Sequence, residues 1–90
     1  IDKDLLLEVQ GKSAYLFTHL SRLPHVLSVT GLGLMIGLET EKPARAVAEA
    51  CLEKGLIVLT AKNKVRLLPP LCIRKDEMDF ALKILNEVLA

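Results

Sequence analysis

Residues 55–70 read GLIVLTAKNKVRLLPP and carry the strongest signal for the fold of this chain. A wholly apolar run, residues 56–60, is followed by a polar turn at residues 61–64 and by a second short run at residues 65–68. The two prolines after the second run end the strand, because proline cannot donate a hydrogen bond to a sheet. The pattern predicts a β-hairpin whose first strand is covered on both faces.

A second pair of strands is predicted upstream of this hairpin. Residues 26–30 read as a short strand, and residues 31–33, Gly-Leu-Gly, predict a break. Residues 34–40 then alternate between apolar and other side chains, which predicts a strand with one buried face. The buried face would carry Leu34, Ile36 and Leu38, and the open face Met35, Gly37 and Glu39.

Two helices are predicted around these strands. An apolar stripe at helical spacing runs from Leu6 to Leu23 and ends before Pro24, since the residue before a proline avoids helical angles. A second helix is expected between Pro43, which suits a first turn, and Gly55, which suits a helix end. The inner face of the second helix would carry Ala44, Val47, Ala48, Cys51 and Leu52.

A third helix is expected over residues 75–89, with acidic residues in its first turn that favour the helix dipole. Its buried stripe would carry Met78, Ala81, Leu82, Leu85, Val88 and Leu89. The element order is therefore α-β-β-α-β-β-α. We expect one domain over residues 1–90, of mixed α/β (α+β) class, with a small and largely antiparallel sheet packed on helices.

The charge balance and the cysteines narrow the classes of partner. The chain has 12 Lys and Arg against 11 Asp and Glu, and aromatic residues make up 3%. A nucleic-acid surface needs a basic face with stacking rings, so we expect no nucleic-acid partner. No apolar run approaches the roughly 20 residues that span a bilayer, so we expect no membrane partner. Cys51 and Cys72 are predicted to be buried, reduced thiols, which favours a cytoplasmic protein.

Most chemistry-bearing residues fit no catalytic or metal-binding pattern. The segment from Gly31 to Gly37 has the glycines of a phosphate-binding loop, but the third glycine comes one residue late and a strand follows instead of a helix. His19 and His25 lack neighbours at metal-ligand spacing. The lysines fall on polar faces or in turns. We therefore predict no catalytic residue, no metal ligand and no cofactor-binding residue in this chain.

Arg66 is the candidate for binding chemistry. It lies on the second strand of the predicted hairpin, between apolar neighbours and shortly before the stiff Pro69-Pro70 unit. A guanidinium can hold a carboxylate through two parallel hydrogen bonds. On periodicity alone, however, a solvated arginine on a strand is the favoured interpretation.

Two segments at this spacing resemble the class III aminotransferases, which use pyridoxal phosphate. Residues 31–39 read GLGLMIGLE, and residues 55–61, GLIVLTA, lead to residues 65–71, VRLLPPL. The resemblance covers nearly the whole chain in register. Within the family it is greatest to the branch that acts on N-acetylornithine.

The resemblance implies that the chain is the small C-terminal domain of a fold type I enzyme. The parent would transfer an amino group from N-acetylornithine to 2-oxoglutarate in arginine biosynthesis. In the family the arginine of this motif binds the substrate's α-carboxylate, and Arg66 occupies that position. The resemblance also places the cofactor, pyridoxal 5'-phosphate, and its lysine in a large domain of the same polypeptide. It implies a homodimeric parent and an inactive fragment. Because the chain begins at Ile1 and not at methionine, we expect further protein upstream.

Three positions depart from the family pattern. Thr30 replaces a common arginine, the hairpin turn at residues 62–64 is short, and Arg74 stands where a Ser or Thr usually caps the last helix, a loss of about 1 kcal/mol. The first two keep ornithine and 4-aminobutyrate aminotransferases open as alternatives. A free-standing α/β module that binds a small metabolite or a partner protein is a further hypothesis. An RNA-binding sheet would need exposed aromatic residues on its strands, and the predicted strands carry none.

Overall fold

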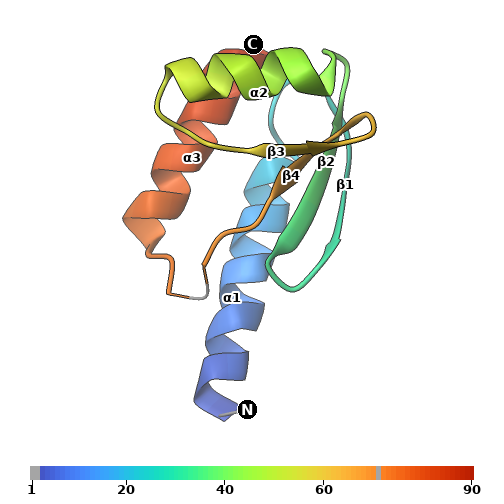
Figure 1. The fold of residues 1–90 in the computed structure, drawn as a ribbon. Coiled ribbons are helices and arrows are strands. Elements are labelled where there is room, and N and C mark those ends of the chain that lie inside the picture. Colours follow the sequence, from blue (N-terminus) through green and yellow to red (C-terminus); the bar gives the residue numbers. More distant parts are fainter. Residues whose placement is uncertain (1–2, 71) are drawn as a thin grey trace.

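The computed structural model describes residues 3–70 and 72–90, with the side chain of Leu32 left out. Within these residues the elements are α1 (Lys3–Leu20), β1 (Val26–Leu32), β2 (Met35–Thr40), α2 (Ala44–Glu53), β3 (Leu59–Ala61), β4 (Lys64–Leu67) and α3 (Lys75–Leu89). The predicted order α-β-β-α-β-β-α is confirmed. Figure 1 shows α2 across the end of the sheet near the C-terminus, while the first turns of α1 project beyond the opposite end.

The sheet has the strand order β1-β2-β4-β3, and each neighbouring pair is antiparallel. The predicted hairpin of β3 with β4 forms, and β1 pairs with β2 in a second hairpin. Pairing of β2 with β4 joins the hairpins and sets Gly37 directly opposite Arg66. The two middle strands therefore bring together segments that lie far apart in the sequence.

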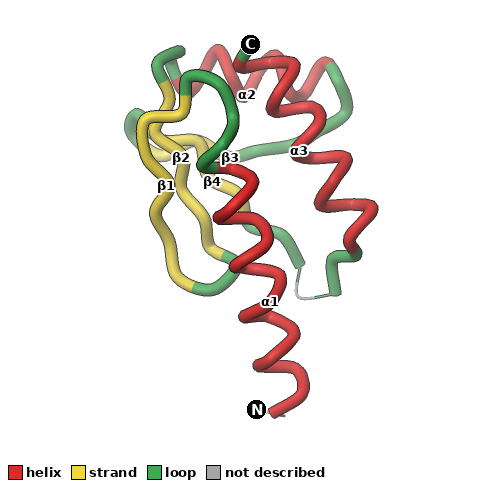
Figure 2. Tube along the Cα trace, turned by 180° about the vertical axis from the view of Figure 1, so that it is seen from behind, coloured by secondary structure: helices red, strands yellow, loops and turns green. Residues whose placement is uncertain are grey.

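The core lies between the helices and one face of the sheet. Ile36, Leu38 and Val65 point to this face and are at most 2% exposed. Helix α1 packs on β1 and α3, and α2 packs on β3, β4 and α3. In the view from behind, α1 lies between the strands and α3 (Figure 2). The predicted buried face of residues 34–40 is thus confirmed, and the opposite face of the sheet stays open.

Helix α3 has the bounds that the sequence predicts, and Arg74 precedes it. The backbone N–H of Arg74 donates to Glu77 Oε1 at 2.9 Å, which supplies half of a capping box without a Ser or Thr. The missing cap is therefore partly replaced. Ile84, which the predicted stripe omits, is also buried, because α3 meets both α1 and α2.

Helix α1 ends at Leu20, three residues before the predicted end at Leu23. The backbone N–H groups of Arg22 and Leu23 donate to carbonyls three residues back, at 3.2 Å each, so the chain tightens into turns before Pro24. The proline rule thus locates the end of the helical segment to within one turn.

The break predicted at residues 31–33 is wrong, because β1 continues through Gly31 and Leu32 and the turn lies at Gly33 and Leu34. Gly31 has φ +152°, and a Cβ there would lie 2.0 Å from the carbonyl oxygen of Met35. The close approach of the two strands requires glycine at this position. Gly31 therefore continues the strand instead of ending it.

The strand predicted at residues 56–60, covered on both faces, is also wrong. Strand β3 has only three residues and lies at the edge of the sheet, and Ile57 is 78% exposed. An apolar run indicates a preference for burial, but it does not show whether other segments of this chain pack over it. The same holds for Leu52, which was predicted on the inner face of α2 and is 62% exposed.

Candidate functional site

Arg66 lies in the middle of β4 on the open face of the sheet. Its neighbours on either side across the sheet are Gly37 on β2 and Leu59 on β3. Over the described part of the chain, its side chain makes no hydrogen bond and no ion pair. The guanidinium is therefore exposed and available to a ligand, and it is not held in a local ion pair.

A groove of about 320 Å³ passes beside Arg66 on this open face. Strands β1, β2 and β4 and the residue after β4 line it: Thr30, Gly31, Met35, Ile36, Gly37, Lys64, Arg66, Leu67 and Leu68. Its wall is largely apolar around a few polar groups, which is the usual composition of a small-molecule site. A short acid with an aliphatic chain has the complementary chemistry.

Gly37 keeps the floor of the groove open. A Cβ at this position would lie 3.3 Å from Thr30 Oγ1 and 3.8 Å from Lys64 Cδ. Any side chain would therefore occupy the space between β1 and β4 beside Arg66. This glycine provides room for a ligand, and the phosphate-loop interpretation of the glycines is not needed.

Lys64 is a groove residue that the sequence reasoning missed. It was assigned to the polar turn, but it is the first residue of β4 and lies half-buried on the same face as Arg66. The signal that could have identified it is its spacing, two residues before Arg66, because residues two apart on a strand share a face. The turn is shorter than predicted and involves Lys62, which has φ +57°.

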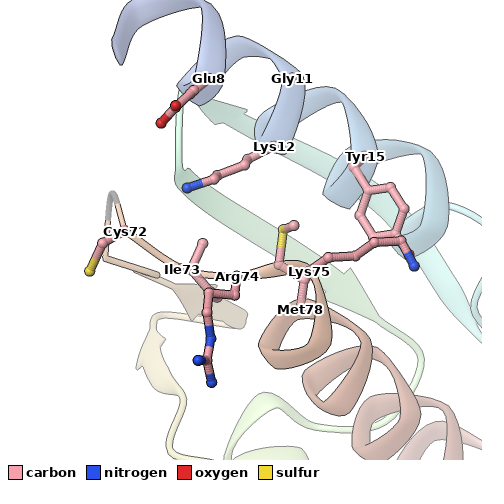
Figure 3. A pocket seen from close by; sticks show the side chains of 9 residues that line it. All are labelled: Glu8, Gly11, Lys12, Tyr15, Cys72, Ile73, Arg74, Lys75 and Met78. Carbon is pink, nitrogen blue, oxygen red and sulfur yellow. The ribbon is translucent and has the colours of Figure 1, made fainter. Parts of the chain in front are cut away.

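A second hollow of about 540 Å³ lies between α1 and the segment that leads into α3. Figure 3 shows Lys12, Arg74 and Lys75 around it, with Glu8 and Tyr15 on α1. Arg74 pairs with Asp76 at 3.4 Å, and Lys75 pairs with Asp79 at 3.0 Å. Arg74 and Lys75 already have carboxylate partners, so this hollow is a weaker candidate for an anionic ligand than the groove at Arg66.

Asp79 connects α3 to α1. Its carboxylate accepts hydrogen bonds from the hydroxyl of Tyr15 on α1 and from Lys75 Nζ one turn earlier on α3. The bond from Tyr15, followed by that from Lys75, lowers the pKa of Asp79 below its ordinary value of 3.8. The same bond raises the pKa of Tyr15. Asp79 therefore stabilises the packing of α1 on α3 in its charged form.

This gives a pH-dependent stability that can be measured. The contribution of Asp79 should be fully present above pH 3.8 and should be lost as the pH falls through its lower folded-state pKa. In urea unfolding, Asp79→Asn should differ most from wild type at neutral pH, and the difference should shrink in acid. Tyr15→Phe, which removes the first donor, should weaken the same dependence. Wild-type and Asp79→Asn curves that stay parallel from neutral pH into acid would contradict this role.

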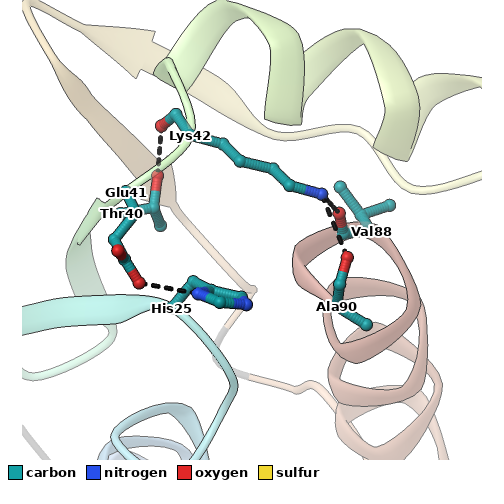
Figure 4. Close-up of polar contacts among 6 residues, drawn as sticks. All are labelled: His25, Thr40, Glu41, Lys42, Val88 and Ala90. Carbon is teal, nitrogen blue, oxygen red and sulfur yellow. Dashed lines mark hydrogen bonds and ion pairs between the residues drawn. The ribbon is translucent and has the colours of Figure 1, made fainter.

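The other polar clusters hold the fold together. Lys42 Nζ donates to the carbonyl oxygens of Val88 at 2.7 Å and Ala90 at 3.2 Å, and so binds the end of α3 (Figure 4). His25 Nδ1 lies 2.6 Å from Glu41 Oε2 between two connecting segments. In residues 3–70 and 72–90, no group of three or more His, Cys, Asp or Glu side chains could hold a metal ion.

The cysteines differ from the prediction in one case. Cys51 is buried in α2, and burial raises the pKa of its thiol. Cys72 is exposed, because it lies in the loop after the two prolines and outside the core.

Among the described residues, none of the helices has both the length and the apolar character that a membrane span requires.

Comparison with known protein families identifies the family to which this chain belongs. The family model for class III aminotransferases, "Aminotransferase class-III", matches residues 1–89. The chain belongs to the class III aminotransferase family. The family resemblance drawn from the two sequence segments is thereby confirmed, although Leu71 at the end of the second segment lies outside the described residues.

Acetylornithine aminotransferases are among the similar relatives of this class III chain. The chain is 42% identical to that of Haemophilus ducreyi over 87 residues, which cover 94% of this chain and 22% of the relative. It is 52% identical to the acetylornithine aminotransferase of Streptococcus mutans over 64 residues, which cover 70% of this chain and 17% of the relative. The chain thus spans about a quarter or less of the length of these relatives.

Solved structures confirm the fold of this class III chain as part of a fold type I aminotransferase. It matches N-acetylornithine aminotransferase from Stenotrophomonas maltophilia with a TM-score of 0.85 and 24% identity, over 97% of this chain and 26% of that one. It matches lysine aminotransferase from M. tuberculosis with a TM-score of 0.87 and 25% identity, and the match covers 97% of this chain and 22% of that one. The likeness to the first shows the fold alone.

Proposed function

We propose that this chain is the C-terminal small domain of an acetylornithine aminotransferase. The parent would transfer an amino group from N-acetylornithine to 2-oxoglutarate, a step of arginine biosynthesis. The relatives that are 42% and 52% identical to this chain, both acetylornithine aminotransferases, support the choice of amino donor. The single observation that carries the proposal is the exposed, unpaired Arg66 in a groove of a class III chain.

Arg66 is the proposed anchor for the α-carboxylate of the amino acid and of the oxo-acid. Its planar fork can donate two parallel hydrogen bonds to a carboxylate. A substrate held at one end in this way presents its α-carbon in a fixed position, and such positioning contributes a large share of the rate in reactions of this kind. The apolar wall beside Arg66, which includes Met35 and Leu68, would accept the aliphatic part of the substrate.

The described residues do not fit the cofactor of the family. No lysine among them is buried, and the groove is lined by strand residues without a helix N-terminus that could hold a phosphate. Pyridoxal 5'-phosphate, when bound, supplies the electron sink of the reaction. We therefore assign its lysine and phosphate ligands to a large domain of the same polypeptide. On this view the fragment is inactive alone, and the parent is a cytoplasmic homodimer.

The amino donor can be tested directly. In the full-length protein, kcat/KM should be higher for N-acetylornithine than for ornithine or 4-aminobutyrate by about tenfold or more, since a site built for a polar group rejects substrates that lack it. A preference for ornithine or 4-aminobutyrate would move the chain to that branch of the family. Absence of transamination with all three donors would favour the remaining hypothesis, a metabolite-binding or protein-interaction module.

A further inference from the structure

We infer that Leu59 is a positioning residue for Arg66, which turns the guanidinium toward the groove and away from the edge of the sheet. The inference rests on the proposed function, because Arg66 is the proposed anchor of the substrate carboxylate. On this view Leu59 contacts no substrate. It acts only through the direction that it gives to the arginine side chain.

Arg66 has very different neighbours on its two sides. In the antiparallel register it lies opposite Gly37 on β2 and opposite Leu59 on β3. Residues directly opposite each other share a face of the sheet, with Cβ atoms roughly 4.5–5.5 Å apart. Leu59 therefore lies on the open face within reach of the aliphatic part of Arg66, whereas Gly37 presents no side chain.

The groove lies on only one of these sides. Among the described residues, its lining comes from β1, β2, β4 and the residue after β4, and none of it comes from β3. Arg66 therefore lies between the groove and the leucine on the edge strand. A guanidinium that extends over Gly37 reaches the groove, and one that extends over β3 does not.

Polar contacts do not fix the direction of the Arg66 side chain. Over residues 3–70 and 72–90 it makes no hydrogen bond and no ion pair. The aliphatic part of an arginine packs along apolar surface while the charged end stays in water. Leu59, 51% exposed on the edge strand, provides this surface. Its side chain also occupies the space over β3, so the guanidinium extends over Gly37, where no side chain opposes it.

The edge strand presents two side chains of different size to the open face. Leu59 lies opposite Arg66, and Ala61 lies opposite Lys64. A large exposed apolar residue on an edge strand favours aggregation, so such residues are normally avoided there. The leucine opposite Arg66 and the alanine opposite Lys64 indicate that bulk is required beside the arginine.

Binding to the full-length protein with its cofactor tests this role without relying on turnover. The probe is pentanoate, which has a carboxylate and an aliphatic chain but no amino group, so it cannot be transaminated. Leu59→Ala should raise the Kd for pentanoate about fivefold, because the arginine must then be ordered at the moment of binding. Leu59→Met, which keeps a long apolar side chain, should retain wild-type binding.

Two further variants separate this role from a contribution to folding. Leu59→Thr keeps a residue that favours strands but removes the long apolar side chain, so it should weaken binding as Leu59→Ala does. Ile57→Ala is the matched control, because Ile57 is 78% exposed just before β3 and, in the described register, pairs with no residue of β4. This control should leave the Kd unchanged.

The coupling between the two residues is the decisive readout. In the Arg66→Met background, Leu59→Ala should change the Kd for pentanoate no further, because Leu59 acts only through the guanidinium. A residue that merely stabilises the sheet would weaken binding equally in both backgrounds.

The outcomes separate this inference from the proposed function. Wild-type binding in Leu59→Ala, or an equal loss with and without Arg66, would overturn the positioning role. If Arg66→Lys weakens pentanoate binding and Leu59→Ala does not, this inference alone fails. If Arg66→Lys leaves pentanoate binding unchanged, the proposed carboxylate anchor fails as well.

Discussion

In the full-length protein, Arg66→Lys is expected to raise the KM for N-acetylornithine, glutamate and 2-oxoglutarate together by at least about tenfold. The substitution keeps the positive charge but removes the planar fork that makes two parallel hydrogen bonds to a carboxylate. A shared loss is expected because each of these substrates has an α-carboxylate. Steady-state kinetics with each substrate varied in turn provide the measurement.

A matched arginine shows whether this effect belongs to the groove. Arg45 on α2 is exposed and pairs with Glu49 one turn later, at 3.3 Å, away from the groove. Arg45→Lys should leave every KM unchanged, because an exposed pair of this kind contributes little. Unchanged kinetics in Arg66→Lys would remove Arg66 from the substrate site and leave it as a solvated arginine on a strand.

Gly31→Ala should destabilise the chain by about 2–4 kcal/mol in urea unfolding. The new Cβ would lie 2.0 Å from the backbone oxygen of Met35, in a backbone conformation, φ +152°, that residues with side chains rarely adopt. The carbonyl cannot move away without breaking the pairing of β1 with β2. The same strands line the groove, so this substitution should also weaken the binding of carboxylates.

Gly11→Ala is the control for this prediction. No atom lies within 4 Å of a Cβ at Gly11, which is inside α1. The substitution should stabilise the chain by roughly 0.5–1 kcal/mol, because alanine loses less conformational entropy than glycine in a helix. Equal unfolding midpoints for wild type and Gly31→Ala would show that β1 and β2 do not approach as closely as the structure has them.

Sequence patterns located the elements where a local signal was strong. The bounds of α3 and the pairing of β3 with β4 were predicted correctly, since helical spacing and turn residues act over a few neighbours. The patterns were less informative where the answer depended on another segment. The sequence pattern predicts a break at Gly31, but this residue continues strand β1. It assigns Lys64 to a turn, but this residue begins strand β4.

The candidate site could likewise be predicted only in part from the sequence. Arg66 could be selected from the sequence, because its neighbours and the following prolines mark it and the family resemblance gives it a role. The groove around it could not be predicted, because its floor is Gly37 from a different hairpin. The placement of Lys64 beside that floor also required the coordinates.

The amino-acid sequence by itself determined the element order, the buried face of β2 and the family of this chain, because each of these is written in short-range pattern and motif. Only the tertiary structure decided that β2 pairs with β4, which face of the sheet stays open, and which cations share the groove. The physical reason is that strand pairing and burial depend on contacts between segments distant in sequence, and no local periodicity specifies the partner.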